Sequence, residues 1–330
     1  MLKSFFLRAP AVTGLSLLII ALLLSVSIAF PPFLDPVNLK SAFDDTALLM
    51  MMAVGEMFVL LTRSVDLSVA ANAALTGMVV ALFNAKHPGA GILPVLLISL
   101  VMGSALGAVN GLLVWKLRIP SIVVTLGTLS VFRGLVYIIS GGAWVNSGQM
   151  SHAFLNLVRL PLLGINLLSW AGVLIAILAF LFLRYSLTGR NLYAAGNNPE
   201  AAAYAGIDVG RLQCVAFMLS GAIAGLSGYF WVARFGVAYT DVASGFELQV
   251  IAACVIGGVS ISGGAGGVVG VILGALFLGI IKNALPVVGI SPFFQLLISG
   301  LVITVAVALN SGTQRKTHGR HILESKKVTP

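Results

Sequence analysis

The chain has 330 residues, of which 59% are hydrophobic and only 9% are charged. An average soluble domain has roughly 45–50% apolar and about 25% charged residues, so this composition excludes an ordinary water-soluble globule. The net charge of +9 does not indicate nucleic-acid binding, because the basic residues lie in short loops and tails that set membrane orientation. The sequence therefore predicts an all-α, polytopic membrane protein.

Apolar stretches long enough for a helix to cross a hydrocarbon core of about 30 Å recur along the chain. The first resembles a signal peptide, but it exceeds the roughly 7–15 apolar residues of one, so we expect it to be retained. The eighth is the least regular, because it leads into a glycine-rich run at 257–267. We expect about ten transmembrane helices, at approximately 11–30, 46–62, 67–84, 93–114, 119–140, 165–183, 212–233, 245–260, 268–284 and 291–309.

The distribution of Lys and Arg predicts that both termini are cytoplasmic. In that orientation thirteen of the 19 basic residues lie on the cytoplasmic side and five lie outside, with Arg133 inside a span. If the eighth run were only a re-entrant hairpin, the basic tail at 315–321 would lie outside, so the tail favours ten spans. No repeat or linker interrupts the chain, and we expect one membrane domain over 1–310 with a polar cytoplasmic tail at 311–330.

Glycines recur every four residues in three of these runs, as small residues do where membrane helices pack closely. We expect contacts within the chain, with a subunit interface or a moving seam as the alternative. The run 257–267 lacks the spacing of a nucleotide-binding motif, and no cysteine or histidine spacing indicates a metal. We therefore expect no catalytic site, no metal and no cofactor. The repeated glycines are Gly103, Gly107 and Gly111, then Gly221 and Gly225, then Gly266, Gly270 and Gly274.

Three ionisable residues lie within or beside apolar runs. Glu56 is about ten residues into the second expected span, which at about 1.5 Å per residue is near the bilayer midplane. A charge there costs roughly 2.5–3.5 kcal/mol unless it is paired. Arg133 lies at a similar depth, so we expect a Glu56–Arg133 ion pair; the alternatives are a protonated Glu56 and an Arg133 that extends outward. Asp66 begins the third span, where a carboxylate complements the positive helix end.

One polar stretch, GRNLYAAGNNPEAAAYAGI at 189–207, separates two apolar runs. Asn198 can cap a helix that starts with Pro199 and Glu200, and Gly206 is a typical stop. A helix of about two turns is not stable alone in water, so a contact must hold it. It either packs under its own bundle or binds a groove on a cytoplasmic partner.

The same stretch resembles the cytoplasmic coupling segment of the permease subunits of ribose-type bacterial sugar ABC importers. Three further stretches, VLLTRSVDLSV at 59–69, IPSIVVTLGTLSVFRGL at 119–135 and AACVIGGVSISGGAGGVVGVILGAL at 252–276, resemble the same family. They occur in the family's order and cover most of the chain. The chain departs from the family pattern at Arg63-Ser64, which replace glycines and leave the geometry of that turn open.

The resemblance implies a permease of the bacterial inner membrane rather than an enzyme. Its partners would be a second permease chain, the same or a sister, a cytoplasmic ATPase dimer, a periplasmic sugar-binding protein and membrane lipid. ATP hydrolysis would belong to the ATPase. By the resemblance, the residues that meet the ATPase are Gly189, Arg190, Tyr193, Gly196, Asn198, Glu200, Ala201, Ala202 and Gly206.

Residues 133–151 look most like permeases for rhamnose or autoinducer-2. A neutral polyol needs hydrogen bonds and aromatic faces along its path, and we expect Trp144, Asn146 and Gln149 to supply them near the outer mouth. An ordinary interfacial Trp is the alternative. Two rival functions remain: an ion-gradient-driven secondary transporter with Glu56 as proton carrier, and an assembly partner without transport.

Overall fold

The computed structural model of the chain describes residues 10–287, 289, 291, 294, 297, 300, 301 and 304. Both termini and the predicted tail at 311–330 lie outside the described residues, as does most of the predicted tenth span. The described helices are α2 (Pro10–Ala29), α3 (Pro36–Leu61), α4 (Val69–Lys86), α5 (Ile92–Leu117), α6 (Ser121–Ser140), α7 (His152–Asn156), α8 (Leu167–Tyr185), α9 (Leu187–Asn197), α10 (Pro199–Tyr204), α11 (Val209–Phe235), α12 (Phe246–Ile256) and α13 (Val268–Val287).

Short elements connect these helices. Two antiparallel pairings join β1 (Val145–Asn146) to β4 (Val237–Ala238) and β2 (Pro161–Leu162) to β3 (Ile165–Asn166). Single 3-10 turns lie at Pro31–Leu34, Pro88–Ala90, Ser147–Gln149 and Leu157–Arg159. The chain is helical in its long elements, as the sequence predicts.

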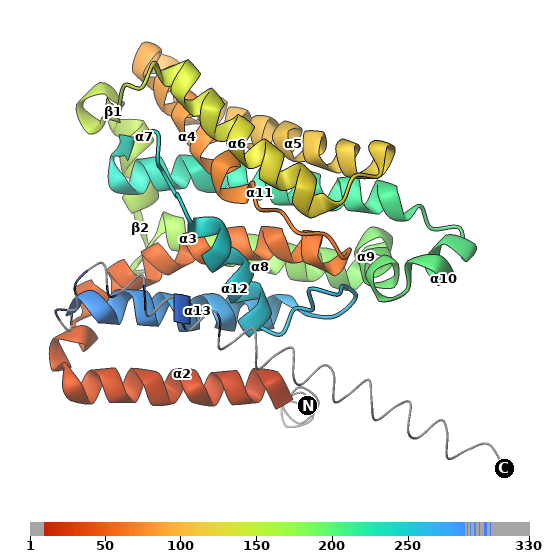
Figure 1. The fold of residues 1–330 in the computed structure, drawn as a ribbon. Helices are drawn as coiled ribbons and strands as arrows, with labels where there is room; N and C mark the ends of the chain where they lie inside the picture. The colour runs from red at the N-terminus through yellow and green to blue at the C-terminus, as the bar shows by residue number, and fades with distance from the viewer. Residues whose placement is uncertain are drawn as a thin grey trace.

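The long helices lie side by side, with α2 and α13 along one edge and α5 and α6 along the other (Figure 1). Helix α3 is the central element, because every residue from Thr46 to Leu61 is buried. A helix that is apolar all round needs neighbours on every side, and α3 packs against α8, α11, α12 and α13. Helices α9 and α10 project from one end of the bundle (Figure 1).

Within the described residues, six helices are long and apolar enough to cross a membrane: α4, α5, α6, α8, α11 and α13. Helix α3 is long as well, but it carries Asp44, Asp45 and Glu56. The predicted eighth span at 245–260 is wrong as a continuous helix. Helix α12 has 11 residues, about 16 Å, which is half of a hydrocarbon core, and turns precede it at residues 240–245. The glycines that follow Ile256 end the helix early.

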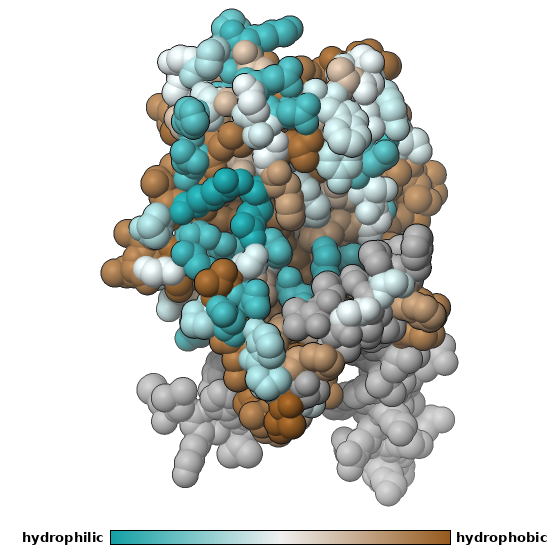
Figure 2. Space-filling model, turned by 90° about the vertical axis from the view of Figure 1, so that its left-hand side faces the viewer, coloured by the Kyte–Doolittle hydropathy of each residue, from teal (hydrophilic) through white to brown (hydrophobic). Residues whose placement is uncertain are grey.

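The bundle has the surface expected of a membrane protein. Figure 2 views the end opposite α10 and shows hydrophilic residues over its middle, with hydrophobic residues along the sides. An ion pair between Arg234 and Asp45, 3.2 Å from Nε to Oδ1, joins the last turn of α11 to α3 at this end. Apolar side chains along the outer faces of α5, α6 and α8 are exposed, where lipid or another apolar surface would cover them.

The repeated glycines pack helices within the chain, as predicted, except Gly266, which lies in the loop before α13 and packs against Val259. A Cβ on Gly107 of α5 would overlap the carbonyl oxygen of Phe217 on α11, and a Cβ on Gly103 would overlap that of Gly221. On α13, Gly270 and Gly274 lie against the backbone of α12 in the same way. Because no side chain separates these backbones, the helices approach each other closely and dispersion contacts hold them together.

We predict that Gly107→Ala lowers the free energy of unfolding of the detergent-solubilised protein by about 1–3 kcal/mol, the usual cost of overpacking, and we would measure it by thermal unfolding. The matched control is Gly127→Ala on α6, where an added Cβ meets nothing within 4 Å. Alanine is the better helix former there by up to about 1 kcal/mol, so the control should keep or gain stability. Equal losses in the two variants would contradict the close α5–α11 approach.

Candidate functional site

The polar stretch folds as two consecutive helices, which we call the α9–α10 segment (residues 187–206). The capping predictions for α10 are confirmed: the Asn198 side chain accepts from the Ala201 N–H at 3.1 Å, Pro199 begins the helix, and Gly206 has a φ of +82°. The N–H of Ile207 returns to the Ala202 carbonyl at 3.0 Å, which closes the C-terminus. Helix α9 was not predicted from the sequence. Its N-terminus is capped by Ser186, whose hydroxyl accepts from the Gly189 N–H.

The predicted contact residues divide into two groups. Gly189, Gly196 and Ala202 are buried and Tyr193 is half-buried, so these residues hold the segment to its own bundle. The exposed group, which is free to meet a partner, consists of Arg190, Asn198, Glu200, Ala201 and Gly206. Tyr204 was not among the predicted contact residues, but its side chain is 93% exposed at the end of α10. A tyrosine in an otherwise alanine-rich helix was the signal.

The α9–α10 segment is anchored where three backbones meet, which we call the glycine junction: Leu61 at the end of α3, Gly196 near the end of α9, and Gly263 and Gly264 in the α12–α13 loop. The Gly264 N–H donates to the Leu61 carbonyl at 3.0 Å. A Cβ on Gly196 would overlap Leu61, and one on Gly264 would overlap Asn197. The glycine-rich run 257–267 therefore serves close backbone approach.

A tyrosine hydroxyl adds a second tie between α9 and this loop. Tyr193 donates from its hydroxyl to the Gly266 carbonyl at 3.1 Å. Burial raises the pKa of the Tyr193 hydroxyl above its usual value, because desolvation disfavours the phenolate. The hydroxyl therefore remains a proton donor at any physiological pH.

Arg63 joins α9 to the turn after α3. Its Nε donates to the Gly196 carbonyl at 2.7 Å and its Nη2 to the Asn197 carbonyl at 3.0 Å. These are the last carbonyls of α9, which have no partner within the helix, and a cation at a helix C-terminus is also favoured electrostatically.

The same residue settles the geometry of the turn that departs from the family pattern. Arg63 has a φ of +60°, a conformation that costs an L residue roughly 1–2 kcal/mol. Hydrogen bonds from a charged donor contribute about 1.5–3 kcal/mol each in favourable cases, and less where solvent screens them. The two bonds to α9 offset the strain, so the left-handed turn is kept without glycine.

The turn continues into a non-helical stretch, residues 62–68, which we call the break segment. Gln213 of α11 donates from Nε2 to the Thr62 carbonyl and to Ser64 Oγ, both at 3.3 Å. The Val65 N–H donates to Ser121 Oγ at the start of α6, and Thr125 Oγ1 donates to the Val65 carbonyl at 3.2 Å. Two long helices are thus tied directly to this backbone.

A buried polar chain leads from the break segment into the bundle. Asp66 Oδ1 accepts from the N–H and the hydroxyl of Ser68, at 2.8 and 2.7 Å. Asn110 of α5 donates to Ser68 Oγ at 2.8 Å, and Thr128 of α6 donates to Asn110 Oδ1 at 2.7 Å. Asp66 thus organises the entry to α4 through local hydrogen bonds, close to the role that its position suggested.

The predicted Glu56–Arg133 ion pair is wrong. Glu56 Oε1 accepts from the Asp66 N–H at 3.0 Å, whereas Arg133 donates to the Val242 carbonyl at 2.6 Å and to the Thr240 carbonyl. The predicted midplane depth is wrong because α3 begins at Pro36, ten residues before the expected span, while its end hardly changes, so that Glu56 lies near the end of the helix and not at its middle. The Glu56 side chain is fully buried, and no finding supports a role as proton carrier.

The three predicted substrate-path residues lie at the end opposite the α9–α10 segment. Trp144 is 59% exposed and contacts the ring of Tyr239, with centroids 5.5 Å apart. Asn146 and Gln149 form a capping box around a 3-10 turn. Their side chains have structural partners of their own, and their contact with a transported solute stays a prediction.

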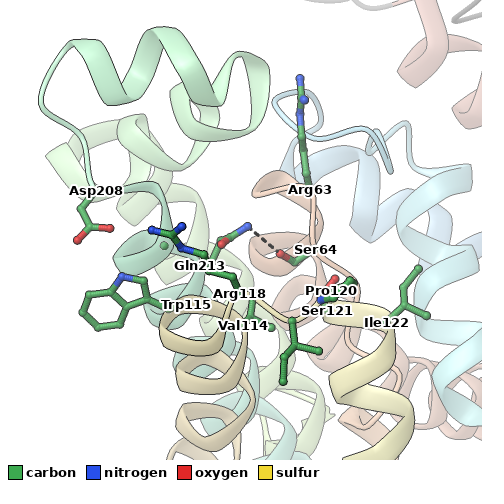
Figure 3. A pocket seen from close by; sticks show the side chains of 12 residues that line it. Arg63, Ser64, Val114, Trp115, Arg118, Pro120, Ser121, Ile122, Asp208 and Gln213 are labelled. Carbon is green, nitrogen blue, oxygen red and sulfur yellow. Dashed lines mark hydrogen bonds between the residues drawn. The ribbon is translucent and has the colours of Figure 1, made fainter.

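A cavity of about 660 Å³ adjoins the break segment. It lies between the ends of α3 and α5 and the starts of α6 and α11, with Trp115, Arg118, Ser121 and Gln213 in its wall. Figure 3 shows Gln213 bonded to Ser64 across this space, while Arg63 extends away from the other lining side chains. Its position beside the α9–α10 segment puts it at the end of the bundle that the sequence assigns to the cytoplasm.

The described residues thus form an apolar helical bundle with an anchored polar segment at one end. A family model described as the permease component of branched-chain amino acid transport systems matches residues 39–307. The chain belongs to this permease family. The permease is 34% identical to the ribose import permease protein RbsC of Escherichia coli (strain K12) over 317 residues, 94% of this chain and 98% of the relative.

Two further relatives have different printed solutes. The L-arabinose ABC transporter permease protein AraH of Azospirillum brasilense is 34% identical over 296 residues, 89% of the permease and 86% of the relative. The autoinducer 2 import system permease protein LsrC of Salmonella paratyphi B (strain ATCC BAA-1250 / SPB7) is 35% identical over 300 residues, 88% and 85% of the two chains. No solved structure matches the permease.

We predict that Gly264→Ala destabilises the glycine junction more than Gly258→Ala does. Both glycines have positive φ, so each alanine incurs the left-handed cost of roughly 1–2 kcal/mol. Only Gly264 is also crowded, by Asn197, while a Cβ on Gly258 meets nothing within 4 Å. Gly264→Ala should therefore cost about 1–3 kcal/mol more in thermal unfolding and speed proteolysis at 187–207. Indistinguishable variants would exclude the close approach.

Proposed function

We propose that this chain is the permease subunit of an ATP-driven importer for a sugar or sugar-like solute in the bacterial inner membrane, and that its α9–α10 segment docks on a separate ATPase. The observation that carries the proposal is the anchored, capped α10 with Tyr204 almost fully exposed at its end. The relatives named for ribose, L-arabinose and autoinducer-2 import support the solute class. The resemblance of residues 133–151 favours a rhamnose or autoinducer-2 type.

In this proposal the permease works with a second permease chain, an ATPase dimer and a periplasmic sugar-binding protein. ATP binding closes the ATPase dimer and draws the two α10 helices together. The docking energy must differ between the inward- and outward-open states for motion to follow. The anchorage of α9 to the bundle then passes the movement of α10 to the membrane helices. The solute passes through unchanged, and the 144–149 region is the proposed outer contact with it.

The segment must face the cytoplasm. We predict that a cysteine introduced by Tyr204→Cys reacts with a membrane-impermeant maleimide in inverted inner-membrane vesicles and not in intact spheroplasts. The two native cysteines, Cys214 and Cys254, are buried, so the protein without the substitution is the background control. Labelling in intact spheroplasts would place the segment outside the cell and exclude an ATPase partner.

The exposed tyrosine is expected to carry much of the docking energy, since tyrosine is enriched among interface residues whose loss costs about 2 kcal/mol or more. Tyr204→Ala should weaken co-purification of the co-expressed ATPase by about 30-fold, which corresponds to about 2 kcal/mol. Tyr185→Ala is the control, because that side chain is also exposed, at 67%, but lies at the end of α8. ATPase binding that survives Tyr204→Ala and the double change Arg190→Ala with Glu200→Ala would contradict the docking assignment.

A further inference from the structure

Among the described residues, Arg63 is the one side chain whose hydrogen bonds join α9 to the break segment. The other ties of α9 at the glycine junction lead elsewhere: Tyr193 bonds to the α12–α13 loop through Gly266. A displacement of α9 therefore reaches residues 62–68 by two routes. One is backbone packing of Gly196 on Leu61, and the other is the Arg63 guanidinium, which donates hydrogen bonds to two carbonyls of α9.

The break segment is placed to pass such a displacement on. Within three residues of Arg63, its backbone and side chains are bonded to Gln213 of α11, to Ser121 and Thr125 of α6, and to Glu56 of α3. These bonds hold α3, α6 and α11 to one short stretch of chain. The buried polar chain through Asn110 extends the connection to α5.

The surroundings leave the turn room to move. The cavity of about 660 Å³ lies against Arg63 and Ser64 on one side, so this part of the break segment is not packed by apolar side chains all round. Figure 3 shows the cavity residues on one side of the turn and the Arg63 side chain pointing away from them. A hydrogen-bonded turn beside a cavity can shift as a unit, whereas the packed backbones of α5 and α11 cannot.

We infer that Arg63 is a positioning residue that transmits movement of the α9–α10 segment to the break segment and through it to α6 and α11. This inference rests on the proposed function, because it assigns the mechanical link between the ATPase-docking segment and the helices of the bundle. In this role Arg63 acts through the Gly196 and Asn197 carbonyls and not by binding solute or nucleotide.

The test uses the full permease–ATPase complex and hydrogen–deuterium exchange with and without ATP plus vanadate. In the wild type, trapping should change exchange at 187–207, at 62–68 and at 119–125. In Arg63→Gly the change at 187–207 should persist, while the changes at 62–68 and 119–125 should become clearly smaller, because only the packing of Gly196 on Leu61 then connects α9 to the break segment. Glycine adopts a φ of +60° without strain, so this variant removes the two hydrogen bonds to α9 and keeps the conformation of the turn.

Arg118→Gly is the matched control. Arg118 is also an arginine with positive φ, +55°, in the wall of the same cavity, and its side chain makes no hydrogen bond to the α9–α10 segment among the described residues. It should keep all three changes. Arg63→Met keeps an aliphatic side chain and the left-handed backbone conformation but has no hydrogen-bond donors. It is the second variant without the two bonds to α9, and it should show the same reduced changes at 62–68 and 119–125 if the glycine variant fails to fold. Arg63→Lys, with one ammonium for two carbonyls, should restore the distant changes in part.

Two results with the variants would overturn the inference: distant changes as large in Arg63→Gly or Arg63→Met as in the wild type, or an equal reduction in Arg118→Gly. A wild-type complex in which trapping alters 187–207 but leaves 62–68 unchanged would overturn it as well. Failure of the proposed function has a different signature, since the wild-type chain would then neither retain the ATPase nor respond to ATP plus vanadate at 187–207.

Discussion

The fold depends on how backbone that leaves a helix inside an apolar bundle finds its hydrogen-bond partners. Lipid offers none, and an unpaired amide or carbonyl there costs several kcal/mol. The break segment at 62–68 solves this with side chains from other helices: Gln213, Ser121 and Thr125 bind its backbone, and Glu56 accepts from Asp66. Four long helices are fixed relative to one another as a consequence.

Glycine supplies the complementary solution where backbones meet without side chains between them. The α5–α11 seam and the glycine junction both depend on it, but they have different consequences. Along α5 and α11 the glycines join two helices that run side by side over most of their length. At the junction, Gly196 and Gly264 join the ends of helices to a loop, so a short polar segment keeps a defined place although α10 has only six residues.

These two features give the bundle a directional organisation. One end has the α9–α10 segment, the cavity and the turn at Arg63, and the opposite end has the β1–β4 pairing and the exposed Trp144. The half-length α12 connects the two, since the chain passes from β4 through turns into α12 and then into the loop of the glycine junction.

The sequence by itself predicted the helical membrane class, the glycine contacts and the capping of α10, because each depends on local composition or on spacing along one helix. Tyr204 could also have been predicted from the sequence, as the one tyrosine in α10, but was not. The sequence could not reveal that α3 begins ten residues early, that α12 stops at Ile256, or that Glu56 and Arg133 bond to different partners. Those outcomes were decided by the tertiary structure, because depth and partner choice depend on residues far apart in the chain, as with Arg63 and the last carbonyls of α9.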